Sequence, residues 1–165
     1  MLRFLLASAL LALSFTIIPS AAQAQLVEDE EHCVVNIKTT DALNVRSKPS
    51  ASAKVVGQFD YAECGIVVVD ECVGNWCPVE DGHIGGWVNS KYLSMVSPAL
   101  YCVSGVRPGD RLNLRAWPAA TSRVLTQLGR HQCDIAFLPY AVGSWQKIRV
   151  RGREGWASRN YLSGQ

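Results

Sequence analysis

The sequence has 165 residues, of which 48% are hydrophobic, and it contains 16 Lys/Arg against 14 Asp/Glu for a net charge of +2. After the first 24 residues, no apolar run approaches the roughly 20 residues needed to cross a bilayer, which excludes a multispanning membrane protein.

The first 24 residues have the pattern of a secretory signal peptide. Arg3 provides a positive start, an apolar run covers residues 4–18, and Ala22 and Ala24 frame a cleavage site before Gln25. The alternative is a membrane anchor, which is less favoured because the run is short for a span. We therefore expect an exported protein, periplasmic or secreted, with no membrane anchor after cleavage and no nucleic-acid partner.

The remaining chain contains one module twice. Residues 33–94 align with residues 102–163 at a constant offset of 69 without a gap, and 20 of the 62 pairs are identical. The repeated segments include Leu-Asn-Val-Arg at residues 43–46, which returns as Leu-Asn-Leu-Arg at residues 112–115. A repeat of this kind defines the architecture and is interpreted before local structure.

The elements of the first module follow in chain order. Residues 25–32 form an acidic segment that we expect to be a flexible lead-in. Short β-rich runs predict strands at residues 33–37, 43–46, 66–69, 76–79 and 86–88, with another beginning at Val55. Turns are expected at residues 48–52, at Gly74 and Asn75, and at Asp81 and Gly82. Residues 89–93 predict one helical turn and a last strand.

These short strands, without an amphipathic helix, predict an all-β fold of two tandem small barrels. We expect the first barrel at residues 33–96, a linker at 97–101 that packs rather than moves freely, and the second barrel at 102–165. The expected core includes the repeated tryptophans Trp87 and Trp156 and eight aliphatic residues: Leu43, Val45, Ile66, Val79, Leu112, Leu114, Ile135 and Ile148.

Six cysteines in an exported chain predict disulfides. Cys33 and Cys64 return at the offset as Cys102 and Cys133, so these form equivalent pairs, and Cys72 and Cys77 are left to pair across a hairpin. A metal site is the alternative, but it is less favoured because the cysteines and His32, His83 and His131 lack the spacing of zinc ligands. We expect no metal and no cofactor.

The repeated motifs resemble those of the bacterial SH3-like domain, also called SH3b or SH3 type 3. They are Leu-Asn-(Val/Leu)-Arg-x-x-Pro, Val-x-x-Gln, Gly-x-Trp and Gly-Trp-x-x-x-x-Tyr-Leu, each present twice. One departure is that Lys48 and Trp117 stand before the proline where the family usually has glycine. The resemblance implies SH3-like barrels that act as targeting or binding modules of the cell envelope, often on peptidoglycan or peptides.

Aromatic residues are the first candidates for a binding site. Trp76, Tyr92 and their repeat partners Trp145 and Tyr161 stand where SH3 domains place groove aromatics, although core packing is an equal alternative. Val88 and Ala157 replace the proline usual in eukaryotic SH3 domains, which argues against proline-rich ligands. Trp117 is expected to be an exposed contact found only in the second repeat, and Phe137 and Tyr140 are weaker candidates.

Asn44, Arg46 and their partners Asn113 and Arg115 are polar residues within a strand. We expect them to hydrogen-bond to loop backbone rather than to bind a ligand.

Charge distinguishes the two copies. Residues 33–94 contain five Lys/Arg and seven Asp/Glu (net −2), whereas residues 102–165 contain ten Lys/Arg and three Asp/Glu (net +7). Arg149, Arg151 and Arg153 alternate with other residues, so on one strand they would share an outward face. This face is expected to bind an anion, unless it is a solvated surface or the acidic lead-in folds back onto it. Other arginines that extend it are Arg107, Arg111, Arg130 and Arg159.

No catalytic motif is present in the sequence: there is no nucleophile elbow and no glycine-rich phosphate loop. We therefore expect a non-enzymatic module of the cell envelope that recognises peptidoglycan or another anionic envelope ligand or peptide. The alternative is a periplasmic or secreted protein-interaction or adhesion factor. An unrecognised hydrolase is a third hypothesis.

Overall fold

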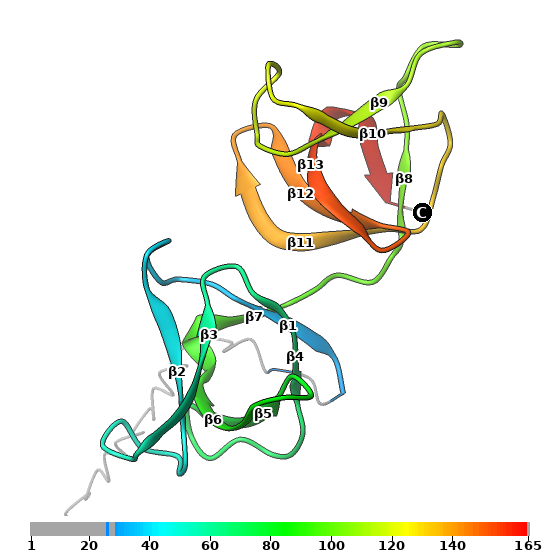
Figure 1. The fold of residues 1–165 in the computed structure, drawn as a ribbon. Helices are drawn as coiled ribbons and strands as arrows, with labels where there is room; N and C mark the ends of the chain where they lie inside the picture. The colour runs from blue at the N-terminus through cyan, green and yellow to red at the C-terminus, as the bar shows by residue number, and fades with distance from the viewer. Residues whose placement is uncertain (1–25, 27–28, 165) are drawn as a thin grey trace, which may run out of the picture.

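The computed structural model describes Leu26 and residues 29–164, so the expected signal peptide and part of the acidic lead-in lie outside the described residues. Within them the protein is all-β, as predicted, with two seven-stranded antiparallel sheets in two small domains (Figure 1). No helix among the described residues has the length and apolar character of a membrane span.

The first sheet has the strand order β3-β2-β6-β5-β4-β1-β7. A 3₁₀ turn, η1 (Ser90–Tyr92), precedes its last strand, which matches the helical turn expected there. The strands are β1 (Glu31–Val34), β2 (Ala42–Arg46), β3 (Val55–Asp60), β4 (Cys64–Val68), β5 (Trp76–Glu80), β6 (Gly85–Asn89) and β7 (Leu93–Met95).

The second sheet repeats the plan with the order β10-β9-β13-β12-β11-β8-β14, so each strand occupies the place of the strand 69 residues before it. Its 3₁₀ turn is η2 (Arg159–Tyr161). The strands are β8 (Tyr101–Val103), β9 (Leu112–Arg115), β10 (Val124–Leu128), β11 (Ile135–Val142), β12 (Trp145–Val150), β13 (Arg153–Ser158) and β14 (Leu162–Gly164).

All eight predicted aliphatic core residues are buried, four in each domain. Trp87 and Trp156 are only partly buried, so the prediction that they belong to the barrel cores is wrong. The reason is the alternation along β6 and β13, where the neighbours Val88 and Ala157 face the core instead. Trp156 packs against a separate cluster between the domains.

The three predicted disulfides are confirmed: Cys33–Cys64, Cys72–Cys77 and Cys102–Cys133. The first and third each join cysteines 31 residues apart in sequence. Val73 and Trp76 exchange two backbone hydrogen bonds of 2.8 and 3.1 Å around the Gly74 turn, which leaves the cystine in the next, closer cross-strand pair.

The expected flexible lead-in ends earlier than predicted, because β1 already begins at Glu31. Glu31 and His32 pair with Val67 and Ile66 of β4, and the Glu31 carbonyl accepts a hydrogen bond from the Val96 amide. His32 is completely buried, and this burial lowers the pKa of its imidazole. These two residues are therefore an integral strand of the first domain.

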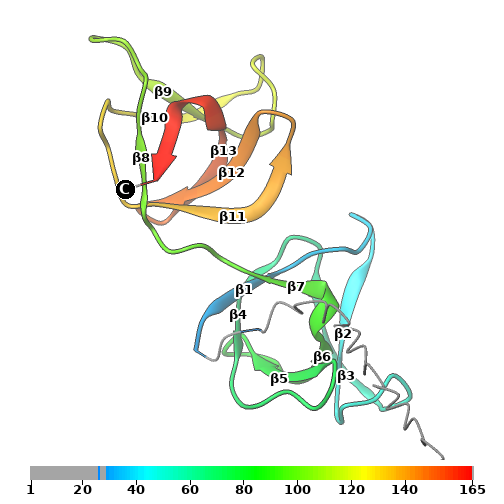
Figure 2. The ribbon, with the colours of Figure 1, turned by 180° about the vertical axis from the view of Figure 1, so that it is seen from behind.

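The linker packs against the second domain, as expected. Val96 is buried, and Ser97 exchanges two hydrogen bonds with the backbone of Phe137 in β11, one through its amide (3.0 Å) and one through its hydroxyl (2.7 Å). In Figures 1 and 2, β11 forms the side of the second domain that faces the first. A third apolar cluster fills this interface with Cys33, Val96, Leu138 and Tyr140.

An irregularity in β11 shapes the interface. The pairing of β11 with β12 is interrupted between Phe137 and Ala141, and the buried amide of Gln146 donates to the carbonyls of Leu138 (2.6 Å) and Tyr140 (3.0 Å). This places Tyr140 so that its hydroxyl donates to the Val34 carbonyl of the first domain at 2.7 Å. The position equivalent to Gln146 is Cys77, so an amide and a cystine occupy the same place in the two hairpins.

Candidate functional site

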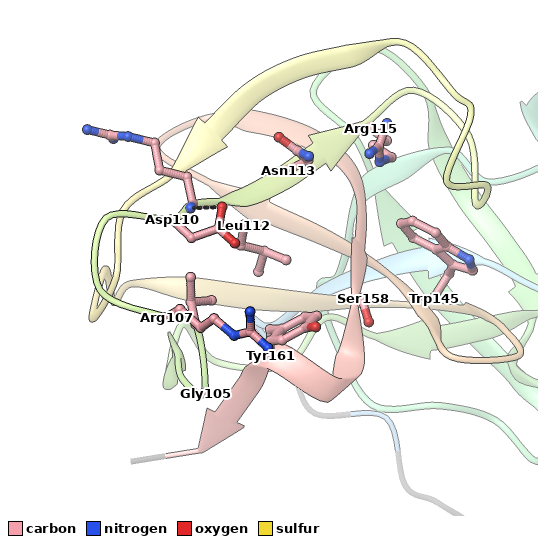
Figure 3. A pocket seen from close by; sticks show the side chains of 11 residues that line it. Gly105, Arg107, Asp110, Leu112, Asn113, Arg115, Trp145, Ser158 and Tyr161 are labelled. Carbon is pink, nitrogen blue, oxygen red and sulfur yellow. Dashed lines mark hydrogen bonds between the residues drawn. The ribbon is translucent and has the colours of Figure 1, made fainter.

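Each domain carries a surface groove, and the larger one lies in the second domain. This second groove has a volume of about 330 Å³. Figure 3 shows Arg115 and Trp145 at one end of it and Gly105, Arg107 and Tyr161 at the other. The remaining lining residues are Val106, Asp110, Arg111, Leu112, Asn113 and Ser158.

The first domain has an equivalent groove of about 300 Å³. Nine of its lining residues lie 69 positions before residues that line the second groove, so the two sites are copies of one another. These nine residues are Ile37, Asp41, Ala42, Leu43, Asn44, Arg46, Trp76, Asn89 and Tyr92, and the other two are Ala51 and Lys91.

In each groove an arginine and an asparagine of the Leu-Asn-x-Arg motif make equivalent hydrogen bonds within the protein. Arg46 donates from its guanidinium to the Ala53 carbonyl (2.8 Å), and Arg115 donates to the Ser122 carbonyl (2.7 Å), which confirms the expected bonds to loop backbone. The asparagines differ from the prediction, since Asn113 accepts from the Gln127 side chain at 2.9 Å and Asn44 accepts likewise from Gln58. The repeated Val-x-x-Gln motif supplies the donor for this bond across strands.

The four predicted groove aromatics all line the grooves, Trp76 and Tyr92 in the first and Trp145 and Tyr161 in the second. Tyr92 also packs partly against the first core, and Lys91 lies over its ring at 4.5 Å. Tyr161 is 42% exposed. The aromatic pairs thus present ring surface to solvent at sites that carry polar groups as well, an arrangement that suits ligand binding.

The predicted face of three arginines on one strand is wrong. Arg149 lies in β12, Arg151 is in the turn with φ 48°, and Arg153 begins β13. Arg153 pairs with Val150, whereas Arg149 pairs with Glu154, so Arg149 and Arg153 lie on opposite faces of the hairpin. Positive φ at Arg151 and Gly152 gives the two-residue turn its conformation.

Arg149 is engaged within the protein. Its guanidinium donates to both carboxylate oxygens of Glu31, including a 2.8 Å bond to Oε1, and to Glu154 at 3.0 and 2.8 Å. The hydrogen bonds that Arg149 donates to Glu31 raise the pKa of the guanidinium. Burial opposes ionisation of Glu154, but Arg149 and Lys147 outweigh it and lower the pKa of that carboxyl. Glu31, near the end of the acidic segment, therefore pairs with this arginine, in agreement with the alternative that this segment contacts the arginine face.

The remaining aromatic candidates lie outside the grooves. Trp117 is 71% exposed on the loop between β9 and β10. Phe137 stacks on Tyr101 with ring centroids 3.6 Å apart, so it contributes to packing. Tyr140 is buried at the domain interface, under Lys147 and beside Tyr61, and burial raises the pKa of its hydroxyl.

Several groove residues were not predicted as one site. The sequence predicts Arg107 and Arg111 only as extensions of the face formed by Arg149, Arg151 and Arg153. It predicts no binding role for Asp41 and Asp110, although all four residues line the grooves. The repeat itself indicates a polar site here, because Asp41 matches Asp110 at the offset of 69. Its neighbour Ala42 matches Arg111, so the charge of this site differs between the two copies. In the described part of the chain, no group of three or more His, Cys, Asp or Glu residues is placed to bind a metal ion.

The fold and the paired grooves define a two-domain β protein with a repeated, aromatic-lined surface site. Comparison with protein families matches residues 41–94 to the bacterial SH3 domain. This match covers the first domain from β2 to β7. A comparison with curated proteins gives no match.

Among solved structures, the chain is similar to NlpC2 and NlpC1 from Trichomonas vaginalis. For NlpC2 the sequence identity is 12% and the TM-score 0.39, with 82% of this chain and 48% of that chain covered. For NlpC1 the values are 13% and 0.38, with coverage of 88% and 49%. The chain spans about half the length of these structures.

Proposed function

We propose that the protein is a non-enzymatic binding module of the bacterial cell envelope and that both domains are SH3-like barrels that bind the peptide part of peptidoglycan. The bacterial SH3 match of residues 41–94 supports this for the first domain. For the second domain, the support is the same strand order and the same groove at the offset of 69. The three disulfides fit an extracytoplasmic location.

The observation that carries the proposal is the repetition of the groove itself. Leu43, Val45 and their partners are buried in the cores, whereas Trp76, Trp145 and Tyr161 line the grooves without belonging to a core cluster, and Tyr92 packs only partly against the first core. Asn44 and Asn113 use their amide oxygens within the protein, and this leaves their NH₂ groups to donate to a ligand carbonyl. Each groove therefore offers the rings of a tryptophan and a tyrosine and the free NH₂ group of an asparagine. These groups can contact the side chains and a backbone carbonyl of a short extended peptide.

A pull-down with purified sacculi tests the proposal. We expect the sacculi to retain the wild-type protein. They should retain less of a variant with Trp76→Ala and Tyr92→Ala, or of one with Trp145→Ala and Tyr161→Ala. A variant with all four substitutions should not be retained. Leu100→Ala, at a residue 54% exposed between β7 and β8 and outside both grooves, is the control. Circular dichroism of each variant verifies folding.

Retention of the fourfold variant at the wild-type level would refute the grooves as the binding sites. If no form of the protein is retained at low salt, peptidoglycan is not the ligand, and a crosslinked protein partner recovered from cells would support the alternative of a protein-interaction factor. Release of soluble fragments from the sacculi by pure protein would show that the module is an enzyme.

A further inference from the structure

The two grooves are not identical in chemistry, and the difference is concentrated at the end next to the tyrosine. Gly105 and Arg107 line the second groove there, whereas their counterparts Asn36 and Lys38 do not line the first. Asn36 instead donates its side-chain amide to the Lys91 carbonyl at 2.9 Å. Gly105 has no side chain to do this, and so the second groove is open at this end.

A tight turn fixes the charged residues at this open end. The Asp110 amide donates to the Arg107 carbonyl at 3.1 Å, and the residues between them are Pro108 and Gly109, the latter with φ 85°. Proline followed by a positive-φ glycine is the sequence of a type II turn. The turn therefore holds Arg107 and Asp110 at this end of the groove (Figure 3), and Arg111, the residue after the turn, lines the groove as well.

The net charge of this rim is positive. The Asp110 carboxylate accepts the Arg111 backbone amide at 2.7 Å, drawn as the dashed line in Figure 3, and Asp41 accepts from Ala42 in the same way at 2.9 Å. The acid is thus part of the turn in both domains. Among the residues that the structure describes, the ion pairs use Lys147 and Arg149, and neither Arg107 nor Arg111 is paired.

We infer that the second groove binds a short peptide by its free C-terminal carboxylate, which Arg107 and Arg111 receive, while the first groove binds peptide without this selection. The inference rests on the proposed function of the grooves and names the ligand group that one of them recognises. Two exposed guanidinium groups beside an aromatic wall complement a carboxylate attached to an apolar backbone. In the first groove Ala42 offers no cation at the matching place, and the ammonium of Lys91, which lines that groove, lies over the Tyr92 ring at 4.5 Å.

NMR titration of the whole protein with two probes tests the inference. The probes are N-acetylated trialanine with a free carboxylate and the same peptide as its C-terminal amide, and the signals followed are the indole N–H groups of Trp145 and Trp76. We expect the acid to bind the second groove about tenfold more tightly than the amide, because an ion pair between guanidinium and carboxylate is replaced by a hydrogen bond from guanidinium to a neutral amide. At the first groove we expect the two peptides to bind equally.

Variants separate the recognition of the carboxylate from the function of the groove. Arg107→Gln with Arg111→Gln should remove the preference for the acid, because it lowers the affinity for the acid more than the affinity for the amide. Arg130→Gln removes an exposed charge outside the groove and should leave the preference intact. The reverse substitutions in the first groove, Asn36→Gly, Lys38→Arg and Ala42→Arg, should create a preference for the acid at Trp76.

Equal affinity of acid and amide at Trp145, or a preference that survives in the glutamine variant, would overturn the inference while the groove function stands. Displacement of the peptide acid by equimolar inorganic phosphate would overturn it in favour of a phosphate ligand. Shifts at neither tryptophan with either peptide would refute peptide binding by the grooves, and with it both proposals.

Discussion

The hydroxyl of Tyr140 should contribute to the stability of the whole protein, because it links the two domains. It donates to the Val34 carbonyl at 2.7 Å, and the residue is only 8% exposed. Removing the hydroxyl by Tyr140→Phe should lower the free energy of unfolding by about 1 kcal/mol, the net value of a typical hydrogen bond within a protein. Tyr140→Ala also removes a buried ring, and the loss should rise to about 3–5 kcal/mol.

Urea unfolding followed by tryptophan fluorescence and by circular dichroism measures both losses. Tyr140→Ala should also separate the transitions of the two domains, since the ring lies in the cluster that joins them. Val142→Ala on the same strand is the control and should change the free energy of unfolding by less than about 0.5 kcal/mol. If Tyr140→Phe behaves like this control, the bond across the interface does not stabilise the fold and the reasoning is refuted.

Three further predictions concern the second domain. Gly155→Ala places a Cβ 2.8 Å from Leu114 Cγ and 2.9 Å from the Arg115 carbonyl, so thermal or urea unfolding should show a loss of about 1–3 kcal/mol, against no loss for Gly129→Ala, whose Cβ has no neighbour within 4 Å. Replacing Cys102 and Cys133 together by serine opens a loop with a sequence separation of 31 and should cost about 3–4 kcal/mol, and a loss below about 1 kcal/mol would contradict this. The pKa of Glu154 is lowered in the folded protein, so its carboxylate stabilises the fold above the ordinary pKa of 4.5, and this contribution disappears as the pH falls through the lower, folded-state pKa. The stability difference between wild type and Glu154→Gln should therefore be largest at neutral pH and decrease below pH 4.5, and a difference that is constant with pH would contradict the assignment.

The prediction that Arg149, Arg151 and Arg153 share one strand face is wrong because local periodicity cannot show where a strand ends. The rule that alternate residues share a face holds only while one strand continues, and the chain reverses at Arg151 and Gly152. The repeat indicates this reversal, because the turn expected at Asp81 and Gly82 corresponds at the offset of 69 to Val150 and Arg151. Applying the turn of one copy to the other would have divided the three arginines between two strands.

The sequence by itself determined the features that depend on local pattern or on covalent chemistry. The duplication, the strands, the buried aliphatic positions and the pairing of the cysteines all follow from repetition, alternation and the chemistry of an oxidising compartment. The same repetition placed Trp76, Trp145 and their tyrosines in equivalent positions, since two copies of one fold present equivalent residues to the same site.

Only the tertiary structure decided which charges are free and which are used. Glu31 and Arg149 are 118 residues apart in sequence, yet they form a bidentate pair across the domain interface, and this pairs one of the three arginines that the sequence singled out. Arg107 and Arg111 stay unpaired beside a groove because a turn directs them there. The strength of a charge as a binding site depends on its nearest partners, and those partners come from distant parts of the chain that meet only in the folded protein.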